Sequence, residues 1–461
     1  MEERDLAFVA AACGGELVSG SSASWVGRVG TDSRQIQAGD LFFAIKGERF
    51  DGHDFLDAVA AKGAVAVVIE RGRRPARLPA CAVILVDEVR RAYGQLGAAY
   101  RRTFSLPVVA VGGSNGKTTT KDLIAAVLRG RFPTLGSEAS FNNDIGVPAT
   151  LLRLGKAHQA AVLEVGTNHP GELAPLVKLI QPRYGVITTI GREHLEFFGD
   201  VAGVAEEEGW LAELLPADGK LFVNGDNEWT EQLVKRTRAT VVRVGWKAGN
   251  AWRASKVRMD SNGTAFQVDT PKPEFCGEYQ INLLGRHQVV NALFAISVGE
   301  ELGLGRAMIQ RGLAECKPAK MRLQLWEANG VGVLDDTYNA NADSVIAALE
   351  VLRDLPCKGR RVAVLGDMAE LGGESEAAHA EIGRRAAETG VSQLFAVGHM
   401  ASVMARSARA TGLNRVIELA DVDVACGVLK TFLKPGDVVL LKASRATRFE
   451  RVAEFLRVGK A

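Results

Sequence analysis

Long apolar runs and a marked excess of one charge are both missing from this sequence. No run approaches the roughly 18 apolar residues that would span a bilayer, and the acidic start, Met1-Glu-Glu-Arg-Asp5, lacks the basic-then-apolar order of a signal peptide. The 56 basic and 54 acidic residues leave a net charge of +2, which gives no reason to expect a nucleic acid or an anionic membrane as partner. We therefore expect a cytoplasmic protein that neither inserts into a membrane nor binds nucleic acid.

Cysteines are few, and low-complexity tracts are absent. The six cysteines never form a Cys-x-x-Cys pair, so neither a zinc site nor a disulfide framework is indicated, and packed thiols are the simpler interpretation. The remaining composition, 47% hydrophobic and 24% charged, is ordinary for a folded protein. At about 100–200 residues per domain, the length indicates two to four domains.

Three regions of the chain differ in texture. Residues 1–87 mix short apolar runs with turns. Residues 88–316 repeat strand, turn and helix, and alternation on both sides of Asn262-Gly263 predicts a hairpin. Residues 317–461 begin another such unit. Short β-type runs separated by helical segments predict an α/β fold with parallel, doubly wound sheets.

A glycine-rich turn follows the strand-like run Val108–Val111 and opens a helix. In Gly112-Gly-Ser-Asn-Gly-Lys-Thr-Thr119, backbone N–H groups at a helix N-terminus would point at phosphate oxygens. Lys117 would reach the β- and γ-phosphates, and the Thr118 hydroxyl would lie on Mg²⁺. The generic motif requires a glycine where Val111 stands and so fails by one residue, which leaves a plain glycine-rich turn as the alternative.

Two side chains near strand ends are candidate magnesium ligands. Glu164 lies in the apolar run Val162–Val165, where a carboxylate is costly unless it is paired or bound to metal. His194 follows the strand that ends at Ile190, and groups beyond the carboxyl ends of parallel strands meet at one edge of the sheet. A purely structural histidine is about as compatible with the sequence.

Several longer segments are similar to those of one family. They are Gly113-Ser-Asn-Gly-Lys-Thr118, Ser140-Phe-Asn-Asn-Asp-Ile-Gly-Val-Pro148, Glu164-Val-Gly-Thr-Asn-His-Pro-Gly-Glu172, His194-Leu-Glu-Phe-Phe-Gly199 and Gly285-Arg-His-Gln-Val-Val-Asn-Ala292. Over essentially the whole chain they resemble the Mur ligases of peptidoglycan synthesis. The resemblance implies three domains: a small N-terminal α/β domain for a UDP-sugar (1–87), a central P-loop ATPase domain with a doubly wound parallel sheet (88–316), and a C-terminal Rossmann-like domain (317–461).

The resemblance also implies roles for individual residues, with ATP and Mg²⁺ as cofactors. Lys117, Glu164, His194 and Arg322 would be catalytic, and Arg322 would reach the phosphates only on domain closure. The residues that would bind ATP are Gly113, Ser114, Asn115, Gly116, Lys117, Thr118, Thr119, Asn291, Arg322 and Asp336, with Asp336 on the ribose. The residues that would hold Mg²⁺ are Thr118, Glu164 and His194.

The implied substrate-binding residues fall into three groups. The UDP moiety would contact Ser33, Arg34, Lys46, Gly52 and His53, although a capped turn with solvated charges also explains Thr31–Arg34. Asn142, Asn143 and Thr167 would lie near the phosphates and the substrate. The amine substrate would contact Tyr338, Asn339, Asn341 and Ser444, for which a structural loop role is about as plausible.

Three further segments narrow the implied reaction. Asp335–Asn341, Leu365–Gly372 and Leu441–Arg445 are similar to the family member that adds D-alanyl-D-alanine to UDP-N-acetylmuramoyl-tripeptide, with Ala342 and Ala443 as small departures. ATP would convert a carboxylate into an acyl-phosphate, which the dipeptide amine then attacks. The alternatives are a tripeptide-forming or folylpolyglutamate-type ligase, a P-loop protein that hydrolyses ATP without ligation, and a small-molecule kinase. We expect a monomer.

One position departs from the family pattern in a way that bears on the metal. Most of these ligases carry a lysine fourteen residues beyond the histidine that corresponds to His194, and carbon dioxide converts it to a carbamate. Here that position is Glu208, within Ala205-Glu-Glu-Glu-Gly209. We expect Glu208 to supply the carboxylate directly or through a water, since Mg²⁺ prefers oxygen ligands and keeps several waters. The alternative is that Glu206–Glu208 form the acidic first turn of a helix.

Overall fold

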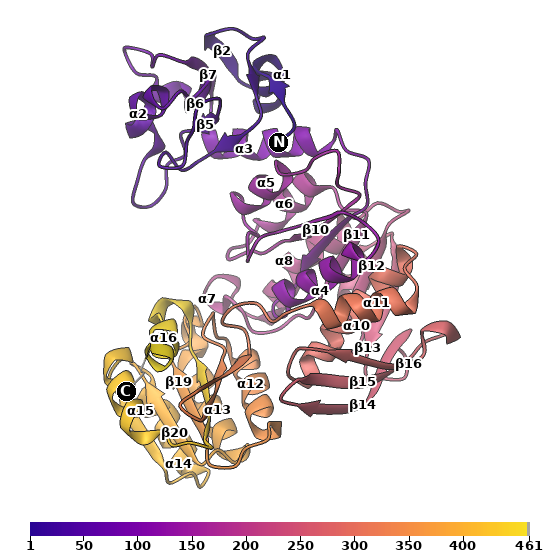
Figure 1. Cartoon of the computed structure of the whole chain (residues 1–461), viewed down its shortest axis with the longest axis vertical. Helices are drawn as coiled ribbons and strands as arrows, with labels where there is room; N and C mark the ends of the chain where they lie inside the picture. The colour runs from indigo at the N-terminus through magenta and orange to yellow at the C-terminus, as the bar shows by residue number, and fades with distance from the viewer. Residues whose placement is uncertain (459–461) are drawn as a thin grey trace.

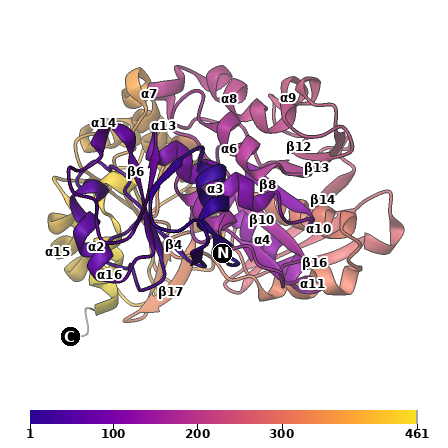
Figure 2. The same ribbon diagram turned by 90° about the horizontal axis from the view of Figure 1, so that it is seen from above.

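The computed structural model describes residues 1–458, which fold into three successive α/β units (Figure 1). The N-terminal and C-terminal units lie at opposite ends of the long axis, and from above the N-terminal unit lies in front of the C-terminal one (Figure 2). Within residues 1–458, no helix is long and apolar enough to cross a membrane.

The N-terminal unit is built on a five-stranded sheet of order β2-β7-β6-β5-β4, in which only β2 is antiparallel to its neighbour. Its elements are β1 (Arg4–Asp5), α1 (Leu6–Cys13), β2 (Glu16–Ser19), β3 (Trp25–Val26), β4 (Val29–Gly30), β5 (Leu41–Phe43), η1 (Gly52–Phe55), α2 (Leu56–Ala61), β6 (Ala66–Glu70), η2 (Arg71–Arg73), β7 (Ala82–Val86) and α3 (Val89–Arg101). Helix α3 joins this unit to the next, because it packs on both α1 and α5.

The central unit carries a nine-stranded sheet of order β16-β15-β14-β13-β12-β11-β8-β10-β9. Its elements are β8 (Val108–Gly112), α4 (Lys117–Arg129), β9 (Thr134–Gly136), α5 (Gly146–Leu151), β10 (Ala160–Glu164), α6 (Leu173–Ile180), β11 (Tyr184–Ile187), α7 (Leu195–Phe198), α8 (Val201–Glu213), β12 (Lys220–Asn224), α9 (Thr230–Arg236), β13 (Thr240–Gly245), β14 (Trp252–Asp260), β15 (Gly263–Asp269), η3 (Pro273–Phe275), β16 (Gly277–Ile281), α10 (Arg286–Glu301) and α11 (Arg306–Glu315).

Alternate residues of the central strands build two separate cores. Val108 and Ala110 of β8 belong to the core with α3, α6 and α8, whereas Val109 and Val111 belong to the core with α4, α10 and α11. This follows from the period of two along a strand, which sends successive side chains to opposite faces. Because both faces are covered by helices, the strand is apolar throughout, and the loops at its ends carry the polar groups.

The C-terminal unit has a six-stranded sheet of order β17-β18-β22-β19-β20-β21, parallel except at the edge strand β17. Its elements are β17 (Gln324–Ala328), β18 (Val331–Asp335), α12 (Ala342–Asp354), β19 (Arg361–Gly366), η4 (Gly372–Glu374), α13 (Ser375–Glu388), β20 (Gln393–Val397), α14 (Ala401–Ala410), β21 (Val416–Leu419), α15 (Val422–Phe432), β22 (Val438–Lys442), η5 (Arg445–Thr447) and α16 (Glu450–Val458).

The predicted α/β class is confirmed, with one correction to the central sheet. The hairpin around Asn262-Gly263 forms as predicted, with Asp260 paired to Gly263. It does not stand apart from the sheet, however, because β14 pairs in parallel with β13 and so adds antiparallel β15 and β16 to the same sheet. The central sheet is therefore mixed rather than wholly parallel. The domain boundaries at 87/88 and 316/317 stay predictions.

Two helical glycines should respond in opposite directions to the same substitution. A Cβ on Gly312 of α11 would lie 2.5 Å from the Cα of Val127 on α4, whereas one on exposed Gly427 of α15 meets nothing within 4 Å. We expect Gly312→Ala to cost about 1–3 kcal/mol through overpacking, and Gly427→Ala to gain about 0.5–1 kcal/mol through helix propensity. Denaturant unfolding of both variants measures this, and equal shifts would contradict the packing described here.

Candidate active site

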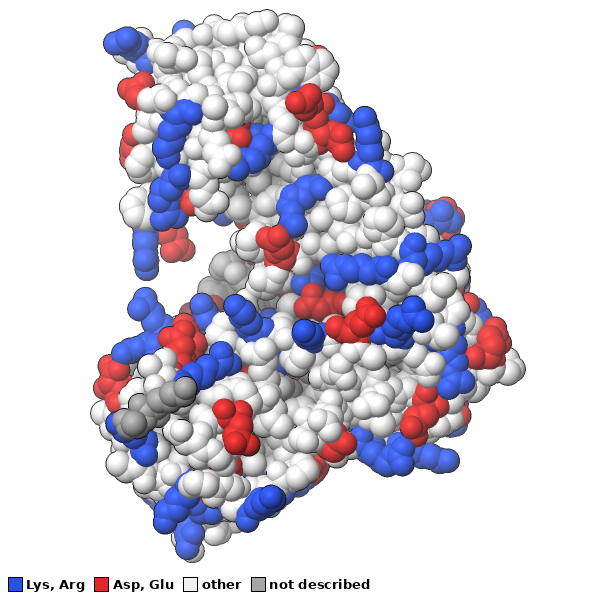
Figure 3. All heavy atoms as spheres, in the orientation of Figure 1, with Lys and Arg blue, Asp and Glu red and all other residues white. Residues whose placement is uncertain are grey.

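A cleft of about 970 Å³ lies between the central and C-terminal units. The space-filling view, in the orientation of Figure 1, shows a separate hollow between the N-terminal unit above and the C-terminal unit below (Figure 3). The predicted residues that line the cleft are Ser114, Asn115, Gly116, Lys117, Thr118, Thr119, Asn142, Asn143, Glu164, Thr167, His194, Asn291, Arg322, Asp336, Tyr338, Asn339, Asn341 and Ser444. The structure therefore brings most of the predicted ATP, magnesium and amine-binding residues to one place.

The phosphate loop connects β8 to α4 and is held open by two glycines with positive φ. A Cβ on Gly113 (φ 108°) would lie 2.5 Å from Thr188 Oγ1, and one on Gly116 (φ 85°) would lie 2.7 Å from Asn291 Oδ1. No larger residue fits either position without displacing a neighbour. Since α4 begins at Lys117, the loop presents a helix N-terminus to the cleft, as phosphate binding requires.

Lys117 is held back against its own loop. Its Nζ donates to the carbonyl of Gly113 and lies 3.1 Å from Glu193 Oε2. Burial would lower the pKa of Lys117, but Glu193, Glu208 and Glu164 oppose it and the pKa is raised. The ammonium is therefore charged and paired with Glu193.

Three buried carboxylates around this lysine each have one oxygen without a partner. Glu164 Oε1 accepts from Asn142 Nδ2 at 2.9 Å, and Glu208 Oε2 accepts from the Gly113 amide at 2.7 Å. The second oxygen of each, and Oε1 of Glu193, are buried and make no hydrogen bond. A buried oxygen of this kind is costly unless a cation or water meets it. The chemistry of this donor set fits Mg²⁺, which prefers carboxylate oxygens.

The three successive glutamates of α8 have three different environments. The helix begins at Val201, so they lie beyond its first turn, and the interpretation of an acidic first turn is wrong. Glu206 is exposed and pairs with Arg236 at 3.2 Å, Glu207 accepts from two backbone amides at the start of α6, and only Glu208 reaches the phosphate loop. Burial raises the pKa of Glu208 to about 8, although Lys117 opposes this rise.

His194 is turned toward the C-terminal unit. Its Nδ1 is bonded to Glu370 Oε2, which leaves Nε2 as the ring nitrogen for a metal. Among the side chains of residues 1–458, no three His, Cys, Asp or Glu groups converge as a ready metal cluster. Glu164, His194 and Glu208 are thus not a preformed site, because His194 bonds Glu370 and Glu208 lies beneath the loop. Their metal roles stay predictions.

Arg322 crosses from the C-terminal unit to the phosphate loop. Its Nη2 donates to Thr118 Oγ1 at 3.2 Å, and its guanidinium lies 4.1 Å from the centre of the Tyr338 ring. The Tyr338 hydroxyl in turn bonds Ser140 of the central unit. The Arg322 guanidinium therefore lies beside the phosphate loop, within reach of a phosphate that bound there.

Asp336 is already bonded inside the C-terminal unit. Its Oδ2 accepts from Lys442 Nζ, and its Oδ1 accepts from the Leu323 amide at 3.1 Å. Burial raises the pKa of Asp336, against the opposing effect of Lys442. Nearby, Asn339 Oδ1 accepts from Ser444 Oγ at 3.4 Å. These contacts tie the loops after β18 and β22 to each other.

Other predicted residues combine cleft exposure with structural bonds. Asn341 caps α12, and its Nδ2 also donates to Asn115 Oδ1 in the phosphate loop at 3.0 Å. Asn143 Oδ1 accepts from the amide of Gly146 at the start of α5, and Thr167 donates to the carbonyl of His169. Asn341 therefore has a structural role as the cap of α12, and its side-chain amide also contacts the phosphate loop.

The segment 191–196 carries an ionic contact that fastens the two units together. The backbone amide of Arg192 donates to Asp343 Oδ2 at 2.9 Å, and its guanidinium donates to Asp343 Oδ1 at 2.6 and 3.0 Å and also to Glu381. With the His194–Glu370 bond, this defines the latch: Arg192 and His194 on the central unit, and Asp343, Glu370 and Glu381 on the C-terminal unit.

Sequence reasoning missed Glu193, Arg192 and Glu370. The available signal was the pair of charged residues directly before His194 in Gly191-Arg-Glu-His194. The partners of these two residues are distant in the sequence. Lys117 is 76 residues from Glu193, and Asp343 and Glu381 are 151 and 189 residues from Arg192. Only the fold brings them together.

Two of the predicted UDP residues lie on the surface of the N-terminal unit, outside the cleft. The Ser33 carbonyl accepts from Lys62 Nζ at 2.8 Å. Arg34 pairs with Asp32 at 2.8 Å, and its side chain is 86% exposed. A guanidinium so exposed can exchange its carboxylate for a phosphate.

The other three lie around one loop and differ in accessibility. Lys46 is exposed. Gly52 is buried, and a Cβ there would lie 2.7 Å from the backbone of Ala44. His53 Nε2 accepts from the Glu70 amide at 3.1 Å, so the ring fixes the loop. Their contacts with UDP stay predictions.

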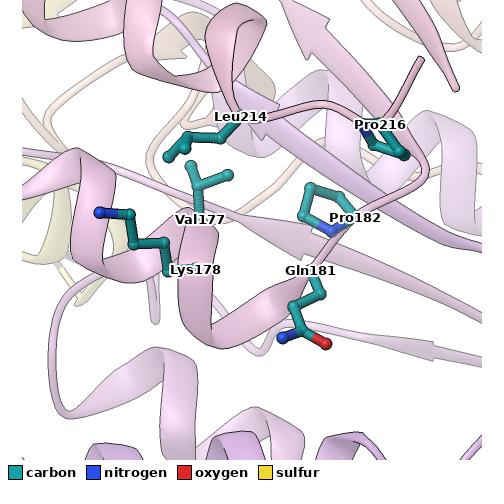
Figure 4. A pocket seen from close by; sticks show the side chains of 6 residues that line it. All are labelled: Val177, Lys178, Gln181, Pro182, Leu214 and Pro216. Carbon is teal, nitrogen blue, oxygen red and sulfur yellow. The ribbon is translucent and has the colours of Figure 1, made fainter.

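A second, smaller hollow of about 320 Å³ lies on the central unit, between α6 and the end of α8 (Figure 4). Val177, Lys178, Gln181, Pro182, Leu214 and Pro216 surround it. It offers one amine and one amide, with no carboxylate, nucleophile or phosphate loop, and we assign it no chemistry.

Comparison with known proteins decides the family. Residues 26–101, 111–299 and 321–445 match, respectively, the Mur ligase family catalytic domain, the Mur ligase middle domain and the Mur ligase glutamate ligase domain. The UDP-N-acetylmuramoyl-tripeptide–D-alanyl-D-alanine ligase of Escherichia coli (strain K12) is 38% identical over 434 residues, 93% of each chain. The ligase of the same name from Bacillus subtilis (strain 168) is 34% identical over 93% of this chain and 92% of its own. This chain belongs to the Mur ligase family.

Solved structures agree with this assignment. MurF from Acinetobacter baumannii superposes on this Mur ligase with a TM-score of 0.90 at 31% identity, covering 99% of both chains. MurF from Thermotoga maritima in complex with ADP gives a TM-score of 0.82 at 28% identity, covering 93% of this chain and 96% of its own.

In this Mur ligase, the latch should hold the central and C-terminal units together. Partly exposed ion pairs contribute about 0.2–1 kcal/mol each, so we expect Arg192→Gln to raise the open population several-fold. The variant should show a larger radius of gyration in X-ray scattering and faster amide exchange in residues 191–196. Arg258→Gln, which removes an exposed pair with Glu278 inside the central unit, is the matched control. Identical scattering for both variants would contradict the latch.

Proposed function

We propose that this Mur ligase joins D-alanyl-D-alanine to UDP-N-acetylmuramoyl-tripeptide, with ATP cleavage and through an acyl-phosphate, in the synthesis of peptidoglycan precursors. One observation carries the proposal: a phosphate loop and an arginine of the C-terminal unit meet across one cleft, in a chain 38% identical over 93% of its length to a ligase of that name. We further propose a cytoplasmic monomer.

The first step activates the tripeptide carboxylate. A carboxylate oxygen forms a bond to the γ-phosphorus of ATP, the bond from that phosphorus to the bridging oxygen breaks, and ADP leaves. Lys117, the loop amides and Arg322 face the region of the loop where charge develops, which lowers the barrier by fixed electrostatic stabilisation. Lys117 must leave Glu193 and its loop carbonyl to do so.

Magnesium fits this cleft because buried carboxylate oxygens beside Lys117 lack partners. We propose that Thr118, Glu164 and His194 hold the ion, with Glu208 supporting it from beneath the loop. When bound, Mg²⁺ supplies positive charge against the transferring phosphoryl group and the substrate carboxylate.

The second step forms the amide. The dipeptide nitrogen bonds to the carbonyl carbon, the bond from that carbon to the phosphate oxygen breaks, and phosphate leaves while the amine loses a proton. We propose that Tyr338, Asn339, Asn341 and Ser444 orient the dipeptide, since they line the cleft from the C-terminal unit. Alignment of the two reactants is worth several kcal/mol in such reactions.

The nucleoside of ATP and the UDP moiety of the peptide substrate need binding residues of their own. We propose that Asn291, beside Gly116, and Asp336 contact the nucleoside, with Asn142, Asn143 and Thr167 near the phosphates and the acceptor. The N-terminal residues Ser33, Arg34, Lys46, Gly52 and His53 would hold the UDP moiety. Arg34 is the strongest of these by exposure and charge.

The competing ligases share only the fold. The structure of UDP-N-acetylmuramoyl-L-alanyl-D-glutamate–2,6-diaminopimelate ligase and that of a Mycobacterium tuberculosis folylpolyglutamate synthase are each 16% identical to this chain, with TM-scores of 0.53 and 0.63. Similarity at this level shows the fold and does not indicate the substrate. The choice among amines therefore belongs to experiment.

Phosphate release should require both substrates and Lys117. With ATP and Mg²⁺ present, we expect release only when UDP-N-acetylmuramoyl-tripeptide and D-alanyl-D-alanine are supplied together, with the amide product seen by mass spectrometry. Lys117→Ala should cut turnover on the order of 10²-fold or more, because it removes charge aimed at the phosphoryl group. Release without the amine would instead indicate an ATPase, and a stable phosphorylated product a kinase. Near-normal turnover of folded Lys117→Ala would overturn the ATP site.

Glu208 should act without carbon dioxide. We expect Glu208→Gln to lower turnover about 10–100-fold, as loss of metal support does, and exposed Glu206→Gln to change it less than twofold. Bicarbonate should not stimulate the wild type; stimulation, or equal activity of the two variants, would contradict the assignment.

The same carboxyl should leave a signature in stability. Its folded pKa of about 8 lies above the ordinary 4.5, so the stability due to its neutral form falls as pH rises from about 4.5 to about 8. Glutamine cannot ionise. Between about pH 4.5 and about pH 8, the melting temperature of the ligand-free Glu208→Gln variant should therefore decline less than that of the wild type.

A further inference from the structure

The basic side chains of the cleft differ in how fully they are paired. Five line it: Lys117, Arg192, Arg322, Lys442 and Arg445. Lys117 is held by Glu193, Arg192 by the latch, and Lys442 by Asp336. Arg322 points to Thr118 and the phosphate position. Each of these four therefore has a close partner in the structure, in contrast to Arg445.

Arg445 has a fixed backbone and a weakly engaged guanidinium. Its amide donates to Asn339 Oδ1 at 3.2 Å, which anchors η5 to the loop after β18. Its Nη1 lies 3.4 Å from Glu450 Oε1, and the side chain is 55% exposed. A 3.4 Å pair at such exposure contributes little to folding, so the guanidinium is available to a ligand at low cost.

The separation of Arg445 and Arg322 can be compared with the length of a ligand that would contact both side chains. The Tyr338 ring lies 4.1 Å from the Arg322 guanidinium and 5.9 Å from that of Arg445, so the two guanidinium carbons are no more than about 10 Å apart. A dipeptide spans roughly 7 Å from its amine to its carboxylate. This upper limit is compatible with a dipeptide whose amine lies beside a phosphoryl group at Arg322 and whose carboxylate contacts Arg445.

The amine substrate brings a charge that the reaction itself does not use. D-Alanyl-D-alanine has a carboxylate at the end opposite its reacting amine. A carboxylate entering a closed cleft needs a partner, and the planar guanidinium matches it with two parallel hydrogen bonds. Asn339 and Ser444, which flank Arg445, offer further polar groups.

We propose that Arg445 binds the terminal carboxylate of the dipeptide and so selects amines that carry a carboxylate at dipeptide distance. This rests on the proposed function and deepens it, because it assigns a specificity-determining residue to the amine substrate. The competing assignment, in which Arg445 binds a carboxylate of the UDP-linked peptide, predicts a different KM change.

The test compares D-alanyl-D-alanine with its C-terminal amide, D-alanyl-D-alaninamide. In Arg445→Ala we expect the KM for the dipeptide to rise on the order of 10–100-fold, as loss of a charge-assisted bidentate contact does. The KM values for ATP and the UDP-peptide should stay within about twofold. The wild type should prefer the acid over the amide, and the variant should lose that preference. Arg445→Lys should lie between the two, since lysine keeps the charge and loses the planar fork.

Glu450→Gln is the matched control, because it removes the ion-pair partner and leaves the arginine. Its KM for the dipeptide should be unchanged or lower. Retention of the acid preference by Arg445→Ala, a KM change confined to the UDP-peptide, or a wild-type KM in Arg445→Lys would each overturn the proposal. If Arg445→Ala fails to fold, Arg445→Lys decides. Absence of ligation by the wild type would instead count against the proposed function, so the two failures are distinguishable.

Discussion

The burial of three carboxylates around one lysine is the constraint on which this cleft depends. Glu164, Glu193 and Glu208 are each at most 6% exposed, and each has an oxygen without a hydrogen-bond partner. Such an arrangement is costly unless charges are paired or neutralised. Two responses are visible: Lys117 stays charged against Glu193, and Glu208 has its pKa raised to about 8 by burial. The cleft thus holds unmatched oxygens, and a cation that entered it would relieve that cost.

Segment 191–196 couples this electrostatic site to the arrangement of the units. Arg192 fastens to Asp343 and Glu381, Glu193 holds Lys117, and His194 bonds Glu370. Of these three consecutive residues, the first and the third belong to the latch and the second pairs with Lys117. The third, His194, is also a predicted metal ligand. Because these residues share one stretch of backbone, a movement of the C-terminal unit would shift His194 and Glu193 as well. Separation of the units would accordingly loosen the proposed ATP site, which would link closure to chemistry.

Local signals in the sequence were sufficient for the elements and insufficient for the contacts between units. The strand before the phosphate loop and the hairpin at Asn262-Gly263 follow from periodicity and turn chemistry. The joining of that hairpin to the central sheet depends on pairing between Val244 and Trp252, which no local pattern encodes. Likewise, the residue types around Lys117 were predictable in part, whereas the approach of Glu193 depends on how the loop after β11 folds back.

The three glutamates of α8 show why a residue type alone does not define a role. Successive residues of a helix point about 100° apart, so Glu206, Glu207 and Glu208 face solvent, the start of α6 and the phosphate loop in turn. The side chain beneath the loop also requires a small residue above it, since a Cβ on Gly112 would lie 2.8 Å from Glu208 Oε2. Gly112 and Glu208 therefore depend on each other, because the glycine leaves room for the carboxyl group and the carboxyl group accepts from the Gly113 amide.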